Sequence, residues 1–511
     1  MTDTKERASN FIFIILCMGC LLIPSVGMFI RPTQISYENR ELAELPSLWS
    51  ADGTFNRAFF DGLSDYVADH IALRDQLTAA QAIAEERIFS VSARDSVIAG
   101  DRDWLYYTAT LDDYLHVDQI SDRELYNIAH NVYLIQEYCT LLGKKFLFTI
   151  PPNKNSLYDE QMPAVYRRER ERNIENGRAE SDFERLLPYL EAEGVHYIDL
   201  DRLFSEQEAV LYYRKDSHWN NEGARLVYNA LLDELGIGHE NYEDLEPAIT
   251  NDYIGDLNQM LYGAAAQPEE ALHYLNSKDY FYYENGEAVT APDSDMVEEN
   301  EVETINPLGK GNLLMYRDSF GNSLIPFLSE HFSYAYYSKI VPYPLSDLVT
   351  KLPDYVIIEK VERHLPTLAE VAPVMSAPLR TFSAERMEAA WSPATLAASY
   401  DGVFYRFSGD LTPYSFKVNA PELQEELLKD DSLHILSDDC KIYIEIEDAG
   451  AVTDYEAFLT SKSVDGEAHD HCFDCYVPAL SALEPDAVVR VIAETDGKYL
   501  IAAQEKLGSL L

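Results

Sequence analysis

The stretch "SDRELYNIAHNVYLIQEYCTLLGKKFLFTIPP", Ser121–Pro152, predicts a complete helix followed by a buried strand. Ser121 and Glu124 have the spacing of a capping box, and Gly143 stands where a helix C-terminal cap belongs. The apolar residues between them recur at helical spacing, at Leu125, Ile128, Val132, Ile135, Cys139 and Leu142. The apolar run that follows predicts a strand buried on both faces, which is typical of a parallel sheet covered by helices.

The same alternation of helix and strand continues along the chain. A second capping box, Ser181 with Glu184, precedes the helical pattern of "LLPYLEAEG", and "VHYIDL" follows as a strand. An amphipathic helix starts near Asn220, and strand, helix, strand, helix and strand then follow as "NLLMY", "NSLIPFLSEHF", "YAYYS", "LSDLVTKL" and "DYVIIE". These patterns predict an α/β fold with a parallel sheet and helices on both faces.

Composition divides the rest of the 511 residues. Residues 11–30 carry no charge and are long enough to span the ~30 Å hydrocarbon core, so we predict a transmembrane signal anchor behind a cytoplasmic tail at 1–10. A cleaved signal peptide or a lipid anchor at Cys17 or Cys20 fits less well. We expect a juxtamembrane linker at 31–50, an α/β domain at 51–395 and a β-sandwich-like domain at 396–511. The α/β domain contains an acidic insertion at 240–306, which we interpret as a lobe or lid.

The charge balance excludes nucleic acid as a partner. The chain has 88 acidic and 40 basic residues, a formal net charge of -48, and no basic stripe that would bind a phosphate backbone. Six cysteines do not form a disulfide-dense framework. The stretch "HDHCFDC", His469–Cys475, resembles a zinc ligand set, but only Cys440 is available beyond it, so a disulfide or separately placed cysteines is the better interpretation. We therefore predict no metal and no cofactor.

The stretch "KDSHWNNEGAR", Lys215–Arg225, carries the first part of a candidate catalytic site. Asp216 and His218 stand between the apolar "AVLYY" and a helix start, and Ser319 stands between "NLLMY" and the next helix, so both are predicted at turns from a strand to a helix. Because reactive groups collect at the carboxyl edge of such sheets, we predict a Ser-His-Asp triad with an oxyanion site at the helix start. The structural alternative is a turn carboxylate, a histidine that caps a helix, and an N-cap serine.

Several neighbours are further candidates for this site. Asn153 or Lys154, after a strand, is predicted to face the site, with a plain turn role as the alternative. Arg317 and Asp318 are expected to brace the turn. The similar tripeptide that ends at Ser96 is rejected because it lacks a glycine two residues later and leads into a hairpin. The candidates for substrate or oxyanion contacts are Asn153, Lys154, Gly321, Arg317 and Trp219, although a tryptophan in this position is more often packed in a core.

These motifs resemble a known family. "DSHW" followed by "N..GA", and then "RDSFG", is similar to the SGNH-hydrolase-like alginate O-acetyltransferases of the AlgX and AlgJ type and to their Gram-positive DHHW relatives. The resemblance covers roughly residues 35–365 and includes, in order, "ENRELAELP", "DHIALRD", "DWLYY", "PPNK" and "PDYVIIEKVER". The serine comes last and the spacing is D-x-H, whereas ordinary SGNH esterases have the serine first and D-x-x-H last.

The resemblance implies an SGNH-like, flavodoxin-like fold with Asp216, His218 and Ser319 as the triad. It also implies a membrane-tethered, extracytoplasmic protein that O-acetylates a cell-surface or secreted polysaccharide and receives acetyl from a membrane-bound O-acyltransferase. Two alternatives stay open: a carbohydrate acetyl esterase with the same triad, and a catalytically inactive scaffold that binds polysaccharide. In the transferase and the scaffold the C-terminal β domain is interpreted as a region that holds the glycan.

Overall fold

The computed structural model describes residues 96–275, 278–382, 395–411 and 436–511 apart from residues 465, 481 and 496, together with residues 385–388 and parts of the first 81 residues. In these ranges no helix is both long and apolar enough to cross a membrane. Residues 12, 16, 17, 20 and 21 of the predicted anchor lie outside the described residues, so the anchor stays a prediction. The helix α2 (Phe59–His70) precedes the folded body.

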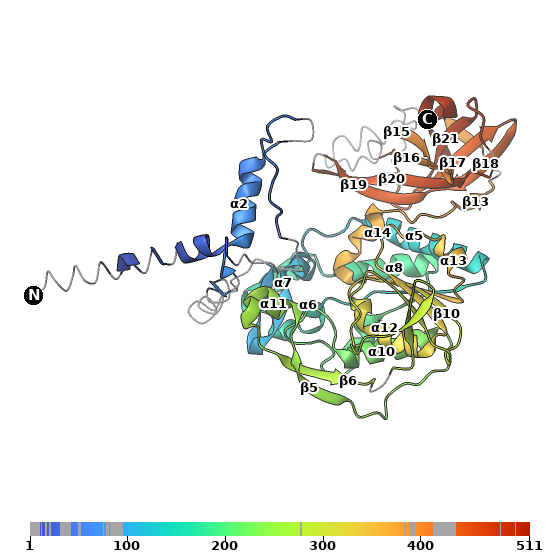
Figure 1. The fold of residues 1–511 in the computed structure, drawn as a ribbon. Coiled ribbons are helices and arrows are strands. Elements are labelled where there is room, and N and C mark those ends of the chain that lie inside the picture. The colour runs from blue at the N-terminus through green and yellow to red at the C-terminus, as the bar shows by residue number, and fades with distance from the viewer. Residues whose placement is uncertain are drawn as a thin grey trace, which may run out of the picture.

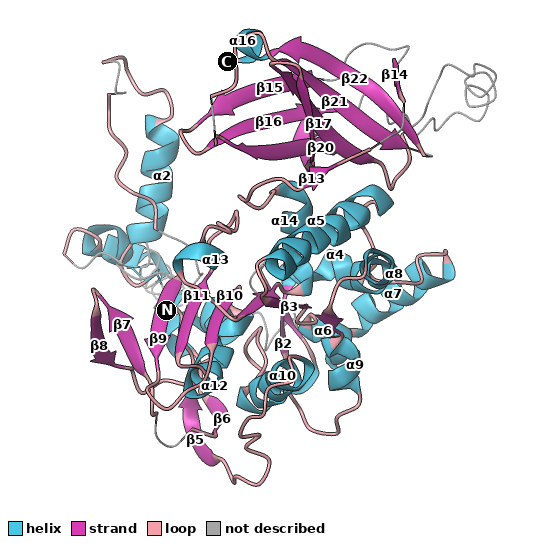
Figure 2. Ribbon diagram, turned by 90° about the vertical axis from the view of Figure 1, so that its right-hand side faces the viewer, coloured by secondary structure: helices cyan, strands magenta, loops and turns pink. Residues whose placement is uncertain are grey.

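A mixed sheet forms the centre of the α/β region (Figures 1 and 2). Its described strands are β3 (Lys145–Thr149), β4 (Tyr197–Ile198), β7 (Phe281–Glu284), β8 (Glu287–Thr290), β9 (Glu301–Ile305), β10 (Asn312–Tyr316), β11 (Tyr334–Ser338) and β12 (Tyr355–Glu359). Their order is β4-β3-β12-β10-β11-β9-β7-β8. The strands from β4 to β11 are parallel, whereas β9, β7 and β8 are antiparallel to their neighbours.

The prediction of a parallel sheet is therefore correct for the centre and wrong for one edge. The antiparallel strands come from residues 240–306, which the sequence analysis interpreted as a lobe or lid without periodicity. Asn285 and Gly286, both with positive φ, form a tight turn between β7 and β8, and only antiparallel strands permit so short a connection. These strands extend the sheet, and β8 is exposed along its whole length.

Helices cover both faces of the sheet, as predicted. One face packs on α5 (Asp122–Leu141), α8 (Asp182–Glu193) and α14 (Pro366–Glu370), with Phe146, Leu314 and Val356 in the shared core. The other face packs on α9 (Leu200–Ser205), α10 (Asn221–Glu234) and α12 (Leu324–His331). Both predicted capping boxes form, at Ser121 and at Ser181, and each fixes a helix start.

The C-terminal region is rich in strands and lies as a separate layer above α5 and α14 (Figure 2). One described sheet contains β13 (Leu379–Arg380), β14 (Arg386–Glu388), β17 (Lys441–Asp448), β18 (Ala451–Glu456), β21 (Val488–Thr495) and β22 (Lys498–Lys506). The other contains β15 (Thr395–Tyr400), β16 (Phe404–Asp410), β19 (Phe458–Val464) and β20 (Glu467–Pro478). Phe407 and Phe473 of one sheet share a core with Ile444 and Val491 of the other, which is the packing of a sandwich.

The two regions meet along α5. Asn131 pairs with the backbone of Leu459 in both directions, at 2.7 and 3.0 Å, and so covers the edge strand β19. The fully buried Arg123 donates to the carbonyls of Asp438, Cys440 and Asp470. These contacts satisfy backbone groups that would otherwise be exposed at the rim of the sandwich.

Three short elements surround the loop that carries Asp216. The hairpin β1 (Val97–Ala99) and β2 (Leu105–Tyr107) forms as predicted. Residues 240–306 supply the hairpin of β5 (Ala248–Tyr253) with β6 (Glu269–His273) and the helix α11 (Asp256–Tyr262). Leu257 of α11 packs with Val97 and Leu105 of the first hairpin. The segment interpreted as a lid therefore packs beside the loop that carries Asp216.

Candidate active site

Ser319 lies at the predicted turn between a strand and a helix. It follows β10 and precedes the short helix η5 (Phe320–Ser323), which continues into α12. Asp318 fixes the turn, because its carboxylate accepts hydrogen bonds from the backbone N–H groups of Phe320, at 3.0 Å, and Val361, at 2.8 Å. The Ser319 backbone N–H makes no hydrogen bond with another described residue. It is therefore free to bind an oxygen at the mouth of the site.

Asp216 and His218 lie on a loop rather than after a strand of the central sheet. The stretch predicted as a strand, "AVLYY", has only an isolated bridge between Tyr212 and Trp219. The loop joins α9 to α10, and Asn220 caps α10 through a hydrogen bond to the N–H of Gly223. The prediction of a strand was wrong because the periodicity of so short an apolar run does not decide its secondary structure, and only Leu211, Tyr212 and Tyr213 of the run are buried.

The three predicted side chains come together in the structure. His218 Nε2 lies 2.8 Å from Ser319 Oγ, and His218 Nδ1 lies 2.7 Å from Asp216 Oδ1. A carboxylate beside Nδ1 holds the proton there, so Nε2 accepts the hydroxyl hydrogen of Ser319. Ser319 and His218 are both half-buried, whereas Asp216 is buried. The arrangement has the hydrogen bonds of a Ser-His-Asp triad; its catalytic use stays a prediction.

The electrostatics of the group follow from burial and from the Asp216 carboxylate. Burial lowers the pKa of His218, but the charge and hydrogen bond of Asp216 outweigh this and leave that pKa above its ordinary value. Burial raises the pKa of Asp216, but His218 and the hydrogen bonds from Asp256 N and Tyr253 bring it well below its usual range. Asp216 is therefore a lasting anion that favours the protonated state of His218.

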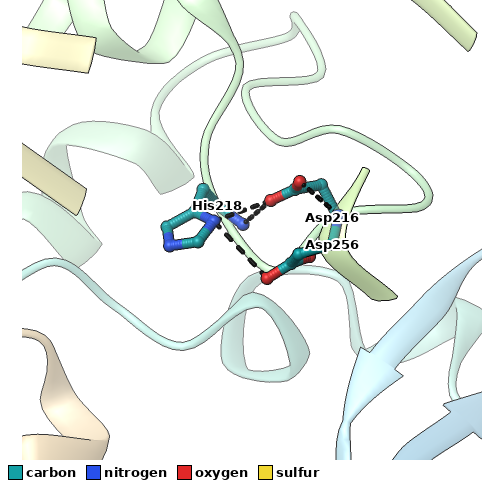
Figure 3. A group of neighbouring side chains, drawn as sticks. All are labelled: Asp216, His218 and Asp256. Carbon is teal, nitrogen blue, oxygen red and sulfur yellow. Dashed lines mark hydrogen bonds and ion pairs between the residues drawn. The ribbon is translucent and has the colours of Figure 1, made fainter. Parts of the chain in front are cut away.

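Asp256 is a second carboxylate at the same imidazole edge (Figure 3). Its Oδ2 lies 3.7 Å from His218 Nδ1, and one ligand atom from each of Asp216, His218 and Asp256 lies within 4.8 Å of the others. These residue types could in principle bind a metal ion. However, the 2.7 Å contact between His218 Nδ1 and Asp216 is a hydrogen bond through the nitrogen that would face the ion. The geometry therefore favours proton transfer over metal binding.

Arg317 and Gly321 support the turn from behind. Arg317 is 1% exposed and donates to the Asn322 side chain and to the backbone carbonyls of Val297 and Glu299. A Cβ at Gly321 would lie 2.7 Å from Arg317 Cδ, so the close packing of the turn requires glycine. Arg317 contacts neither His218 nor Asp216 through a described hydrogen bond. These contacts favour the expected bracing role over substrate contact.

Asn153 and Lys154 follow β3, and both side chains are buried and bonded within the protein. The Asn153 amide donates to Asp113 at 2.9 Å. Lys154 is 5% exposed, and its Nζ donates to the carbonyls of Leu105, Arg214 and Asp216 at 2.7, 2.8 and 2.9 Å. Three acceptors use all three ammonium hydrogens, so none is left for an oxyanion. Lys154 instead ties the loop of Asp216 to the β1–β2 hairpin.

Trp219 lies in the core, the more common role for a tryptophan. It is 1% exposed, its ring packs edge-on against Phe320 at 4.9 Å between centroids, and its Nε1 donates to Ser323 at 2.6 Å. No surface of this ring is open for a sugar to stack on. The tryptophan instead ties the loop of His218 to the helix that follows Ser319.

Three residues near the site were not predicted from the sequence. Tyr253 and Asp256 both bond to the Asp216 carboxylate, and they lie in the segment interpreted as a lid. Arg363 lies with its guanidinium 5.3 Å from the Phe320 ring centroid, and its charge opposes protonation of His218. Arg363 Nε is buried and has no hydrogen-bond partner among the described residues. The position of Arg363 after a predicted strand was the one available signal, because Tyr253 and Asp256 belong to no recognisable sequence pattern.

The cysteines and histidines of the C-terminal region form no second site among the described residues. Cys440, Cys472 and Cys475 are free and buried. His469 pairs with Asp410 at 2.6 Å and His471 with Asp470 at 2.9 Å. The group around His218 is the one place in the described ranges where three metal-ligating side chains gather. The disulfide interpretation is therefore not supported there.

With this geometry in place, comparison with known proteins tests the resemblance drawn from the motifs. Residues 97–307 match the model of the SGNH hydrolase-like domain of the acetyltransferase AlgX. The predicted resemblance to AlgX is thereby confirmed. The matched stretch is less than half of the chain and includes Asp216, His218 and Asp256, whereas Ser319 lies beyond its end. No curated protein matches the chain.

Solved structures resemble the chain weakly. PatB1 of Bacillus cereus is 15% identical over 53% of this chain and 96% of its own, with a TM-score of 0.40. A DHHW family protein from Eubacterium siraeum is 15% identical over 53% and 91%, with a TM-score of 0.39. AlgX of Pseudomonas aeruginosa is 11% identical over 75% and 86%, with a TM-score of 0.34. These values are too low to carry an argument about function.

Proposed function

We propose that this protein is an O-acetyltransferase that acts on a cell-surface or secreted polysaccharide through Ser319, His218 and Asp216. The observation that carries the proposal is the continuous hydrogen-bonded chain from Ser319 Oγ through His218 to Asp216, with heavy-atom distances of 2.8 and 2.7 Å. The match of residues 97–307 to an AlgX acetyltransferase domain supports acetyl transfer as the chemistry. We also propose that an N-terminal anchor holds the protein at the outer side of a membrane, where a membrane-bound O-acyltransferase supplies the acetyl group.

The reaction has two halves that use the same groups. In the first, His218 Nε2 takes the proton of Ser319 as Oγ bonds to the acetyl carbonyl carbon, and His218 then returns the proton to the departing oxygen of the donor. In the second, a sugar hydroxyl loses its proton to His218 and attacks the acetyl-serine, and Ser319 leaves with that proton. Asp216 stabilises the imidazolium in both halves.

The oxyanion of each tetrahedral intermediate needs donors that are not already bonded. The Ser319 backbone N–H has no partner among the described residues, and Nε of Arg363, whose guanidinium lies over the Phe320 ring, has none there either. We assign the oxyanion to this pair, because a donor aimed at developing charge contributes most to the rate. Neither of the cavities along the Arg102–Trp104 turn includes Ser319 or His218 in its lining.

A serine-directed fluorophosphonate tests the nucleophile. We expect one adduct, at Ser319, in the folded protein and none in Ser319→Ala, because removal of Oγ removes the attacking atom. Release of acetyl from 4-nitrophenyl acetate should fall at least about a thousandfold in the same variant. The matched control is Ser96→Ala, which changes the same tripeptide in the β1–β2 region and should leave both readouts unchanged.

The destination of the acetyl group separates the alternatives. With the activated ester and an acceptor oligosaccharide, mass spectrometry should find acetyl on the sugar. Acetyl that reaches only water would replace the transferase with an esterase that has the same triad. A folded protein without an adduct at Ser319 would favour the inactive polysaccharide-binding scaffold.

A further inference from the structure

Asp256 occupies a place that a three-residue triad does not require. Its Oδ2 lies 3.7 Å from His218 Nδ1 and 2.5 Å from Ser217 Oγ, and its Oδ1 accepts the backbone N–H of Ser217 at 2.7 Å. Ser217 Oγ in turn lies 3.3 Å from His218 Nδ1. Because the Ser217 hydroxyl hydrogen points to Asp256, its oxygen is a second, longer acceptor for the Nδ1–H that donates mainly to Asp216. Asp256 therefore reaches His218 directly through space and indirectly through Ser217.

The backbone around Asp256 is fitted to this position. The Asp256 N–H donates to Asp216 Oδ2 at 2.8 Å, and the hydroxyl of Tyr253 donates to the same oxygen at 2.7 Å. A Cβ at Gly255 would lie 2.4 Å from the Lys215 carbonyl oxygen, so only glycine permits this approach. This segment thus fixes Oδ2 of Asp216 and places a second carboxylate beside the same ring (Figure 3).

We propose that Asp256 is a positioning residue of the triad, which holds His218 through Ser217 and adds a second negative charge beside its Nδ1 edge. This inference rests on the proposed function, because the charge matters only if His218 becomes an imidazolium during acyl transfer. In both halves of that reaction His218 carries the proton taken from a hydroxyl, and an anion at 3.7 Å stabilises that charge. Asp256 takes no proton from the substrate and touches no reacting atom.

The charged groups around His218 decide the sign of the effect. Asp216 and Asp256 favour the protonated ring, and Arg363 opposes it. Around Asp256 itself the charged groups are Asp216 and His218, with Lys154 at longer range. Burial and the Asp216 charge raise the pKa of Asp256, so its anion, and with it the stabilisation of His218, increases as pH rises. The Asp256 side chain is 31% exposed, and water screens part of this interaction.

The pH profile of kcat/KM for acetyl release from 4-nitrophenyl acetate tests the inference. The acid limb of the profile follows His218, which must be neutral to accept the Ser319 proton. In Asp256→Asn we expect its midpoint to move to lower pH by about half a unit, and the plateau to fall about tenfold, because a neighbouring anion has been removed. Ser217→Ala should move the midpoint in the same direction by less.

The matched control is Asp252→Asn, which removes an exposed carboxylate from the same hairpin and should change neither value. A purely structural role for Asp256 would lower the plateau and leave the midpoint in place, and that result in both Asp256→Asn and Ser217→Ala would overturn the inference. The two proposals fail differently. If Ser319→Ala loses the fluorophosphonate adduct but the midpoint is unmoved in Asp256→Asn and Ser217→Ala, only the role of Asp256 is rejected. If the adduct persists in Ser319→Ala, the proposed function is rejected.

Discussion

Lys154 holds the loop of Asp216 through the backbone carbonyls of Arg214 and Asp216. Burial lowers its pKa to about 7, and the charge of Asp216 opposes this change. Its three carbonyl acceptors need three N–H donors, so the contacts favour the ammonium form. The rings of Trp104 and Tyr106 lie 5.0 and 5.3 Å from the same nitrogen and add cation–π attraction. A cation buried in this way replaces water that the loop carbonyls would otherwise bind.

Replacement of Lys154 by methionine keeps an unbranched side chain, one atom shorter, and removes all three donors. We expect the free energy of unfolding to fall by about 3 kcal/mol, because buried carbonyls that lose their partner each cost about 1–3 kcal/mol and part of this is recovered by removing a buried charge. Acetyl release should fall with it, since the Asp216 carbonyl loses its anchor. Denaturant titration checks the first effect. The exposed Lys310→Met is the control, and equal stability of the two variants would contradict the expectation.

The segment of β5 and α11 surrounds Asp216, a role that its sequence does not predict. It is acidic and without periodicity, yet it supplies Tyr253, Gly255 and Asp256 to the surroundings of Asp216. Its register against the loop depends on the close contact of Gly255 with Lys215, and on the hydrogen bond from the Asn258 N–H to the Lys215 carbonyl at 3.0 Å. A segment with this many close contacts forms a fixed wall of the site. A lid has to open, and a segment that opens makes fewer contacts with its neighbours.

Gly255→Ala tests this docking. The added methyl group would overlap the Lys215 backbone, and overpacking of this kind costs about 1–3 kcal/mol. We expect α11 to shift and kcat/KM for acetyl release to fall about a hundredfold. The control is Gly238→Ala, where a Cβ would meet nothing within 4 Å. Full activity of Gly255→Ala would show that the triad does not depend on this segment.

The α/β region and the β-rich region are joined by a buried ionic contact. His130 of α5 is fully buried between Glu193 of α8, at 2.8 Å, and Glu456 of β18, at 3.1 Å. Burial lowers the pKa of His130, but the two carboxylates outweigh this and leave it above its ordinary value. Burial raises the pKa of Glu456, but His130 and Arg380 bring it down to about 2. The protonated histidine therefore bridges two regions that are far apart in the chain.

This bridge predicts how the stability of the whole molecule depends on pH. A histidine whose folded pKa is raised stabilises the fold fully below its ordinary pKa, and the contribution is lost as pH rises through the folded pKa. We expect His130→Gln to lower the free energy of unfolding by about 2 kcal/mol at pH 6 and by clearly less at pH 9. Thermal unfolding at both pH values measures the difference. His196→Gln, in a pair with Glu234 that is 45% and 47% exposed, should have little effect at either pH.

Some features of the fold and of the candidate site could be predicted from the sequence alone, and others could not. The helices that begin at Ser121 and Ser181 were predictable because a capping box is a local signal, read from residues three positions apart. The pairing of Ser319 with His218 was predictable because both turns were expected at one edge of a parallel sheet, although the strand before Asp216 is absent. Lys154 and Asn153 were placed in the right turn, but which atoms they bind depends on hairpins elsewhere in the chain.

The sequence by itself determined the alternation of helix and strand, the β-rich C-terminal region, and the three residue types of the candidate triad. Only the tertiary structure decided that residues 240–306 extend the sheet and supply Asp256, that Trp219 is core, and that Arg363 lies beside Phe320. The physical reason is the distance along the chain over which each kind of signal acts. Caps and apolar periodicity act within a few residues, whereas the partner of a buried charge is chosen by segments that meet only when the chain has folded.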